Sequence, residues 1–358
     1  MSRPIRAGID LSALAHNLER ARALAGAARV CAVIKAHAYG HGLLRAARAF
    51  AAADAFGLLE VDNAVRLREA GFAQPIVLLE GFFEPAEFEA IERCRLASVI
   101  HSREQIDMLD AAPATLRLDV FLKLNTGMNR LGFGPAQFAG ALAALRAQPR
   151  VASITLMTHF ADADGAGGVA AQLGEFESTT HGLALPRSLA NSAALMRFPA
   201  TRADWVRPGI MLYGVSPFAG RVGADEGLRP AMTLTSRIIA VQSLAPGQSV
   251  GYGSTFTADR AMRIGVVACG YADGYPRHAP SGAPVQVEGV ATRTVGRVSM
   301  DMLCVDLAPV PAAGVGSAVT LWGDGLPVER VAETAGTIGY ELLCALAARV
   351  AVDEIGGA

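Results

Sequence analysis

The sequence lacks the features that mark membrane proteins and disulfide-rich secreted proteins. Its five cysteines are odd in number and scattered, and no pair has C-x-x-C spacing, so neither a disulfide framework nor a zinc site is suggested. No apolar run approaches the roughly 20 residues of a membrane-spanning helix. The N-terminal segment MSRPIRAGIDLS carries charges but no apolar stretch after them, so we expect no secretory signal and a cytoplasmic location.

The chain also lacks an excess of charge of either sign. It has 32 Lys and Arg against 33 Asp and Glu among 358 residues, a net charge of -1. This balance argues against a broad electrostatic surface for nucleic acid or anionic lipid. Hydrophobic residues make up 52% of the chain, which is enough for a buried core and excludes a disordered chain.

Short, β-rich apolar runs recur through the first two-thirds of the chain. Most are separated by alanine-rich segments with helical periodicity, such as 61–71 and 135–147. Eight parallel strands joined by helices predict an α/β fold of the TIM-barrel type, (β/α)8, and the alternative is an open doubly wound sheet. The absence of a Gly-rich dinucleotide fingerprint after the first run favours the barrel. The eight strand candidates are 29–35, 55–60, 75–80, 96–100, 118–124, 153–159, 187–192 and 205–214.

The pattern changes near Leu228. Strand-like runs separated by Gly, Pro and Asp follow, and helical pattern returns only in 326–336 and 337–350. We therefore expect a barrel domain over 1–227 and a mostly-β domain over 228–358. The strand-like runs are 232–244, 262–270, 283–289, 293–307 and 318–323.

The first strand candidate ends in a lysine, within AVIKAHAYGHG. Active residues of barrels sit at the C-terminal ends of strands, so Lys35 is expected to face that opening. Partial burial lowers the pKa of a lysine from about 10.4 and makes its amine a nucleophile suited to a Schiff base. The alternative is a lysine that reaches solvent from the strand end and pairs with a carboxylate.

The other strand ends also carry polar groups. Buried polar groups without partners are costly, so convergence on one ligand with a phosphate and ring edges would satisfy them. Ser192 and the backbone N–H groups of Gly209 and Ile210 follow the seventh and eighth strands, where barrels commonly bind phosphate. The remaining polar groups at these ends are Lys123, Arg130, His159, Asn191 and Arg207.

Nine segments carry a family resemblance. AVIKAHAYGHG resembles the pyridoxal-phosphate lysine signature of the alanine racemases, and the other eight resemble motifs of that family in the same order along essentially the whole chain. The resemblance implies a barrel plus a β domain, pyridoxal 5'-phosphate as cofactor, a homodimer, and interconversion of L- and D-alanine. The eight further segments are LKLNTGMNRLGF, MTHFADAD, LANSAA, VRPGIMLYG, VGYGSTFTA, GYADGYPR, VGRVSMDM and TIGYE.

The resemblance also implies roles for single residues. Lys35 would hold the cofactor and serve as base on the D-alanine face, and Tyr252 from the second subunit would be the opposite base. Arg130 and the Met300 backbone N–H match the substrate carboxylate site, and Lys123 matches a lysine that is often carbamylated. The other implied cofactor-binding residues are Tyr39, His159, Asn191, Ser192, Arg207, Gly209, Ile210 and Tyr340.

The chemistry supports these roles. Racemisation needs bases on opposite faces of a planar carbanion, because one base tends to return the proton to the face it left. Tyrosine, with a pKa near 10, is a poor base at neutral pH, and a chain from Arg207 through His159 to Tyr252 would stabilise its phenolate. An arginine opposite the pyridine nitrogen leaves the ring unprotonated and a weaker electron sink, which favours quick reprotonation.

Several alternatives stay open. His37 stands where the signature usually has asparagine, so cofactor affinity could differ. A decarboxylase of the same architecture, a non-enzymatic cofactor-binding barrel, a cofactor-free barrel aldolase and a broad-specificity racemase are the competing interpretations. GYGSTF, where such decarboxylases carry a cysteine motif, and Tyr252 favour the racemase. The sequence decides neither the strictness for alanine nor a biosynthetic or degradative role.

Overall fold

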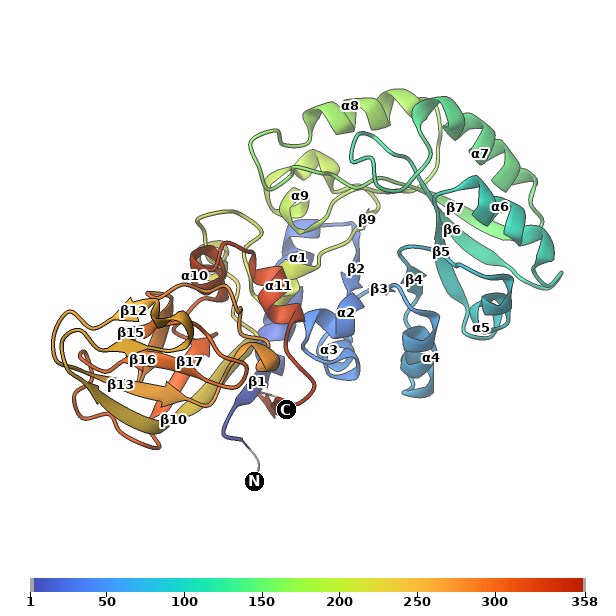
Figure 1. The fold of residues 1–358 in the computed structure, drawn as a ribbon. Coiled ribbons are helices and arrows are strands. Elements are labelled where there is room, and N and C mark those ends of the chain that lie inside the picture. Colours follow the sequence, from blue (N-terminus) through green and yellow to red (C-terminus); the bar gives the residue numbers. More distant parts are fainter. Residues whose placement is uncertain (1–2, 357–358) are drawn as a thin grey trace.

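The first half of the chain closes into a barrel of eight parallel strands. The computed structural model describes residues 3–356, and its barrel strands follow one another in chain order until the last pairs with the first. The predicted (β/α)8 barrel is confirmed (Figure 1). The strands are β2 (Arg29–Val33), β3 (Ala55–Leu58), β4 (Ile76–Leu78), β5 (Leu96–Ile100), β6 (Leu118–Lys123), β7 (Val151–Met157), β8 (Arg187–Ser188) and β9 (Trp205–Val206).

Helices follow the strands and cover the outside of the barrel. The predicted helices over 61–71 and 135–147 correspond to α4 and α7. A separate apolar cluster contributed by the strands, including Cys31, Phe121 and Trp205, fills the inside. The helices are α1 (Leu11–Ala25), α2 (Lys35–Tyr39), α3 (Leu43–Ala49), α4 (Val61–Glu69), α5 (Phe88–Arg93), α6 (Arg103–Met108), α7 (Pro135–Ala147), α8 (Ala170–Thr179) and α9 (Ser192–Arg197), with 3-10 turns at η1 (Pro85–Glu87), η2 (Leu109–Ala111), η3 (Pro199–Thr201), η4 (Ile210–Tyr213) and η5 (Gly223–Glu226).

The last two barrel strands are shorter than the sequence predicted. The expected strand over 187–192 ends after two residues because the Asn191 side chain accepts a hydrogen bond from the Ala194 N–H at 3.0 Å and caps α9. The expected strand over 205–214 ends before Pro208, which has no N–H for a sheet ladder. After β8 and β9 end, the chain continues at the barrel opening, where its side chains and N–H groups can contact a ligand.

The second half forms the expected mostly-β domain. Its strands run in the order β13-β16-β15-β14-β17-β10, and β13 also pairs with β10, which closes the ring. The predicted strand over 293–307 is interrupted at Gly296, whose φ of 74° begins a turn. The elements are β10 (Met232–Leu244), β11 (Ser249–Val250), β12 (Phe256–Thr257), β13 (Met262–Val267), β14 (Pro284–Val287), β15 (Val290–Val295), β16 (Leu303–Asp306), β17 (Ala318–Trp322), α10 (Val328–Thr334) and α11 (Gly339–Cys344), with turns η6 (Tyr252–Ser254) and η7 (Tyr271–Asp273).

Both ends of the chain join this second domain. β1 (Arg6–Asp10) pairs antiparallel with β10 and parallel with β18 (Ala351–Ile355), so a segment that precedes the barrel extends the second sheet. The sequence prediction, which placed the whole of 1–227 in the barrel domain, did not contain this strand. Figure 1 shows β1 leading directly into α1 of the barrel. The two domains therefore share a covalent connection at both the start and the middle of the chain.

Within residues 3–356, we find no helix with the length and apolarity needed to cross a membrane.

Candidate active site

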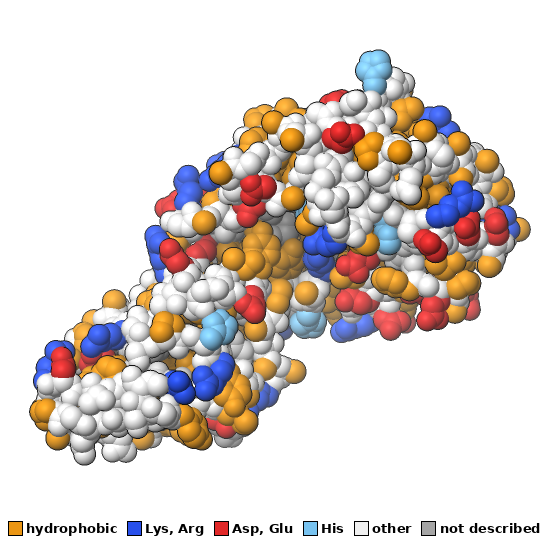
Figure 2. Space-filling view, turned by 45° about the horizontal axis from the view of Figure 1, so that its top comes forward, with side chains coloured by type: hydrophobic (Ala, Val, Ile, Leu, Met, Phe, Trp, Pro, Cys, Tyr) orange, Lys and Arg blue, Asp and Glu red, His pale blue; other side chains and the backbone are white. Residues whose placement is uncertain are grey.

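One cavity of about 620 Å³ opens at the C-terminal ends of the barrel strands. Its volume lies within the range of small-molecule sites. Figure 2 shows a hollow in this face of the molecule, with hydrophobic side chains on one side and Lys or Arg side chains on the other. All predicted site residues except Tyr252 and Met300 line the cavity: Lys35, Tyr39, Lys123, Arg130, His159, Asn191, Ser192, Arg207, Gly209, Ile210 and Tyr340.

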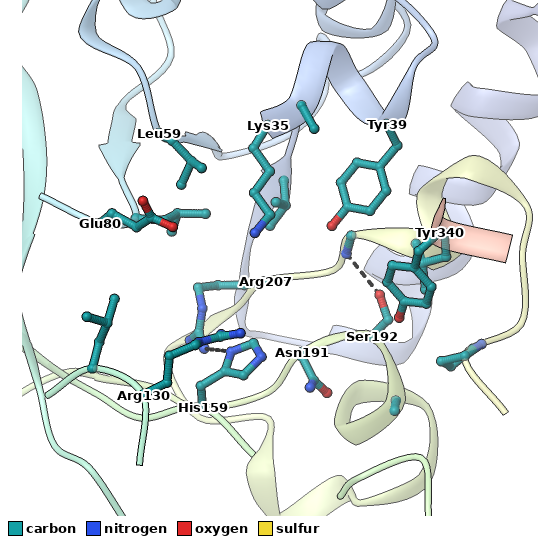
Figure 3. A pocket seen from close by; sticks show the side chains of 18 of the residues that line it. Lys35, Tyr39, Leu59, Glu80, Arg130, His159, Asn191, Ser192, Arg207 and Tyr340 are labelled. Carbon is teal, nitrogen blue, oxygen red and sulfur yellow. Dashed lines mark hydrogen bonds between the residues drawn. The ribbon is translucent and has the colours of Figure 1, made fainter. Parts of the chain in front are cut away.

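Lys35 enters the cavity from an unusual turn. β2 ends at Val33, and the four residues from Ala36 to Tyr39 all have φ between 51° and 54°, in the left-handed region. Left-handed backbone costs about 1–2 kcal/mol for each non-glycine residue, so the surroundings must hold this turn. The turn makes both Lys35 and Tyr39 point into the same space (Figure 3).

Gly40 completes this turn against the second domain. Its φ is 81°, and a Cβ there would lie 2.1 Å from the Leu343 carbonyl oxygen of α11. A glycine is therefore required both for backbone conformation and for close approach. Because α11 packs on α2, it also brings Tyr340 to the cavity, with its ring centroid 6.2 Å from that of Tyr39.

Hydroxyl and N–H groups gather at one end of the cavity. The Gly209 N–H donates to Ser192 Oγ at 2.9 Å, and a Cβ on Gly209 would lie 2.4 Å from Tyr39 Oη. Burial raises the pKa of both Tyr39 and Tyr340, so their hydroxyls keep their protons at neutral pH. This end of the cavity can thus offer several hydrogen-bond donors to an anionic group.

Arg207 forms the floor of the cavity and is 5% exposed. Its guanidinium donates to Ser188 Oγ at 2.7 Å and to the Thr158 carbonyl at 2.8 Å, and within residues 3–356 it has no carboxylate partner. Burial lowers the pKa of Arg207 to about 10, so it remains protonated at neutral pH. Arg207 is thus a permanent cation on the cavity floor, because a guanidinium does not readily give up a proton.

His159 lies against Arg207, with 3.5 Å between its Nδ1 and Arg207 Nη2 (Figure 3). Burial, and then the charge of Arg207, hold the pKa of His159 well below its usual value. The ring is therefore neutral, and because Nδ1 faces a donor, Nε2 carries the proton. His159 presents this N–H as a donor.

Lys123 lies in a cationic part of the cavity and is 6% exposed. Burial, followed by the positive charges of Arg207 and Arg130, lowers the pKa of Lys123 to about 8, while Glu80 acts in the opposite direction. A substantial part of the Lys123 amines is therefore uncharged just above neutral pH.

Tyr252 and Met300 do not reach the cavity of their own chain. Tyr252 begins η6 and is 71% exposed, and Met300 lies between β15 and β16 and is 53% exposed. The loop that contains Met300 is held against η7, because the Met300 carbonyl accepts a hydrogen bond from the Ala272 N–H at 3.0 Å. It is also held by ion pairs: Arg349 contacts Asp301 and the fully buried Asp273, each at 2.7 Å.

The comparisons with known proteins agree with this arrangement. The alanine racemase N-terminal domain family matches residues 9–217, and the alanine racemase C-terminal domain family matches residues 231–353. The chain belongs to the alanine racemase family. It is 60% identical to the alanine racemase of Nitrosospira multiformis over 353 residues, which cover 98% of this chain and 99% of the relative, and 59% identical to that of Nitrosomonas europaea over 356 residues, which cover 98% of each.

Solved structures of the alanine racemase family have the same fold. A biosynthetic alanine racemase from Pseudomonas aeruginosa superposes with a TM-score of 0.96 at 46% identity, over 98% of this chain and 99% of that one. The alanine racemase from Acinetobacter baumannii gives a TM-score of 0.92 at 40% identity with the same coverage.

His37, the departure from the usual asparagine of the alanine racemase signature, has a structural explanation. It occupies a left-handed position, with φ of 53°, where asparagine and histidine are both enriched. Its side chain is exposed and does not line the cavity. The substitution thus preserves the turn and leaves the cavity wall unchanged.

The structure adds residues to the cavity of this alanine racemase family member that sequence analysis did not single out. Glu80, Asp164 and Cys344 line it as well. Glu80 is the last residue of the strand candidate 75–80, so the rule that strand ends carry the site could have found it. Cys344 could not have been found in that way, because it comes from α11 of the second domain.

Proposed function

We propose that this chain interconverts L- and D-alanine by a two-base mechanism with pyridoxal 5'-phosphate, as a cytoplasmic homodimer. Membership of the alanine racemase family supports the reaction, which is that of an isomerase acting on an amino acid. The observation that carries the proposal is the convergence of Lys35, phosphate-type donors and several cations in one cavity.

The residues present fit this cofactor. The donors around Ser192 and Gly209 suit its phosphate, and the amine of Lys35 suits covalent attachment to its aldehyde. Arg207 would lie toward its ring nitrogen. The bound cofactor supplies an electron-withdrawing ring that makes the substrate Cα proton acidic.

Two bases then decide the stereochemical outcome. The Lys35 amine removes or returns the Cα proton on the D-alanine face, and Tyr252 of the partner subunit does so at its Oη on the other face. His159, whose Nε2 carries the proton, supports the tyrosine by donating to the phenolate oxygen. Arg207 contacts His159 and keeps its own proton, so it would not protonate the ring nitrogen of a bound cofactor.

The substrate carboxylate would be bound by cations. Arg130 lines the cavity, and the Met300 N–H of the partner subunit would complete this site. Carbamylation of Lys123 would place an anion beside Arg130 and orient its guanidinium. The lowered pKa of Lys123 supports this modification, because only the uncharged amine reacts with carbon dioxide.

The exposure of Tyr252 and Met300 supports the homodimer. A residue that acts in catalysis cannot lie in solvent away from the cavity, so a second copy must bring these two residues to the first. The five cysteines are free thiols, with no disulfide within residues 3–356, which supports a reducing compartment.

The decisive test incubates the cofactor-loaded protein with L-alanine in deuterated water and separates the products on a chiral column with mass detection. We expect D-alanine that carries deuterium at Cα. Lys35→Arg, which keeps the positive charge but replaces the amine with a guanidinium, is the control and should be inactive. Alanine that stays L and unlabelled, although the protein binds the cofactor, would refute the substrate assignment.

A further inference from the structure

His41 is a buried residue of the AVIKAHAYGHG segment with no part in the mechanism above. Its side chain is fully buried and its Nδ1 lies 2.9 Å from the Tyr39 carbonyl oxygen and 3.2 Å from that of Ala38. Carbonyl oxygens only accept hydrogen bonds, so Nδ1 must carry the proton. Burial lowers the pKa of His41 to about 4, so the ring is neutral at working pH and Nε2 is an unprotonated acceptor.

This arrangement leaves a polar atom without a partner. His41 Nε2 is buried and has no hydrogen-bond partner in the described part of the chain. A buried acceptor that is left unsatisfied destabilises the fold, and a phenylalanine would fill the same space without that loss. The Nδ1 donor must therefore contribute something that an apolar ring cannot.

The contribution is to the left-handed turn. Ala38 and Tyr39, whose carbonyls His41 binds, are the last two of the four left-handed residues. Apart from Nδ1 of His41, the Tyr39 carbonyl has no donor among residues 3–356. His41 thus donates to a carbonyl of the left-handed turn that receives no other hydrogen bond from the described part of the chain.

Tyr213 holds the same turn from the other side. Its ring stacks on Tyr39 at 4.5 Å and lies 4.7 Å from the ring of His41. Its hydroxyl donates to the Val33 carbonyl at 2.8 Å, at the end of β2 and two residues before Lys35. Tyr213 therefore connects the start of the turn to its end.

We propose that His41, with Tyr213, is a positioning residue that holds the left-handed turn so that the Lys35 amine and the Tyr39 hydroxyl face the cofactor site. This inference rests on the proposed function, because it assigns Lys35 and Tyr39 to the cofactor. It predicts that a change at His41 weakens cofactor binding and leaves substrate binding unchanged. Arg130 and Lys123, which face the substrate carboxylate, come from β6 and the loop after it and do not depend on the turn.

The test compares two substitutions at His41. His41→Phe keeps a ring against Tyr213 and removes the donor, whereas His41→Asn loses the ring and keeps an N–H at the position of Nδ1. For His41→Phe we expect cofactor affinity and kcat to fall about tenfold, as for loss of one buried hydrogen bond, with KM for alanine unchanged. His41→Asn should recover most of that loss.

The measurements are titration of the bound cofactor by its visible absorbance, the fraction of Lys35 labelled after borohydride reduction, kcat, KM and thermal unfolding. His181, which is exposed, receives the same two substitutions as a control and should not change. Wild-type cofactor affinity in His41→Phe, or His41→Asn no better than His41→Phe, would overturn the inference. If His41→Phe does not fold, Tyr213→Phe decides: it should weaken cofactor binding, and unchanged affinity overturns the inference.

The outcomes separate this inference from the proposed function. If the wild-type protein neither binds the cofactor nor racemises alanine, the proposed function fails. If the wild type does both and the His41 variants match it, only the positioning role fails.

Discussion

Mixing two inactive variants should restore activity, because each site is proposed to take one base from each chain. In Lys35→Ala the cavity lacks its own base, and in Tyr252→Phe the exposed turn η6 lacks the hydroxyl for the partner. Removing a general base lowers rates by about 10²–10⁴, so each variant alone should be almost inactive. In a mixed dimer, the Tyr252→Phe chain supplies the cavity with Lys35, and the Lys35→Ala chain supplies Tyr252.

The size of the recovery follows from the symmetry of such a dimer. After free exchange of equal amounts, about half of the dimers are mixed, and each has one intact site of two, so activity should reach about one quarter of the wild-type value. The assay is initial racemisation rate after the two proteins are mixed and incubated. The control pairs Lys35→Ala with Arg130→Ala, two changes in the same cavity, and should show no recovery.

Either of two results would refute the reasoning. A mixture of the Lys35 and Tyr252 variants that stays as inactive as its components would mean that Tyr252 does not act across subunits. Recovery in the control mixture would mean that Lys35 and Arg130 do not serve the same site.

Three further predictions address the turn, the Met300 loop and the modified lysine. Gly40→Ala should destabilise the protein in chemical denaturation by clearly more than the about 1–2 kcal/mol of its left-handed φ, whereas Gly182→Ala, at φ 75° with open space, should show only that conformational cost. The hydrogen bond from Arg349 lowers the pKa of Asp301 in the folded protein. The stabilisation from this pair is therefore present above the unfolded pKa of about 4 and is lost as pH falls through the folded pKa. Arg349→Met should lower the Tm at neutral pH and differ less from wild type in acid. With ¹³C-labelled bicarbonate, NMR should show a carbamate signal that grows as pH rises through about 8 at fixed dissolved carbon dioxide and is absent in Lys123→Met.

Each of these has a result that contradicts it. Equal destabilisation of the two glycine variants would mean that the approach of Gly40 to α11 is not close in solution. Arg93→Met, which breaks an exposed pair with Glu89 within one helix, is the control for Arg349→Met. If both variants lower the Tm equally, the pairs of Arg349 with Asp273 and Asp301 stabilise the protein no more than an exposed pair does. A carbamate signal that persists without Lys123 would place the modification elsewhere.

Most of the barrel could be predicted because its signals are local. Each strand was predicted from a short apolar run, most of these runs are separated by alanine-rich helical pattern, and α7 matches the predicted 135–147 at both ends. The site followed from topology, since all parallel strands of a barrel end at one opening. This single rule explains why residues as distant in sequence as Lys35 and Arg207 line one cavity.

The features that could not be predicted depend on non-local contacts. β1 is a five-residue segment whose partners, β10 and β18, are more than 200 residues away. The periodicity of so short a segment does not predict a strand. The left-handed conformation of KAHAY was not predicted, and its contacts include the approach of Gly40 to α11, which comes from the far end of the chain. The role of Tyr252 was predicted from resemblance alone, and Tyr252 does not line the cavity of its own chain.

The charges of the cavity fit the proposed ligands. Lys35, Lys123, Arg130 and Arg207 line it together with Glu80 and Asp164, so cations outnumber carboxylates there, and burial, followed by the charges of Arg207 and Arg130, lowers the pKa of Lys123. The excess of cations attracts anions to this site. The cofactor phosphate, the substrate carboxylate and a carbamate on Lys123 would each supply negative charge, so binding and modification would offset the excess of positive charge in the cavity. The same argument disfavours amino acids with cationic side chains as substrates, because they would add a positive charge to a cavity that already holds an excess.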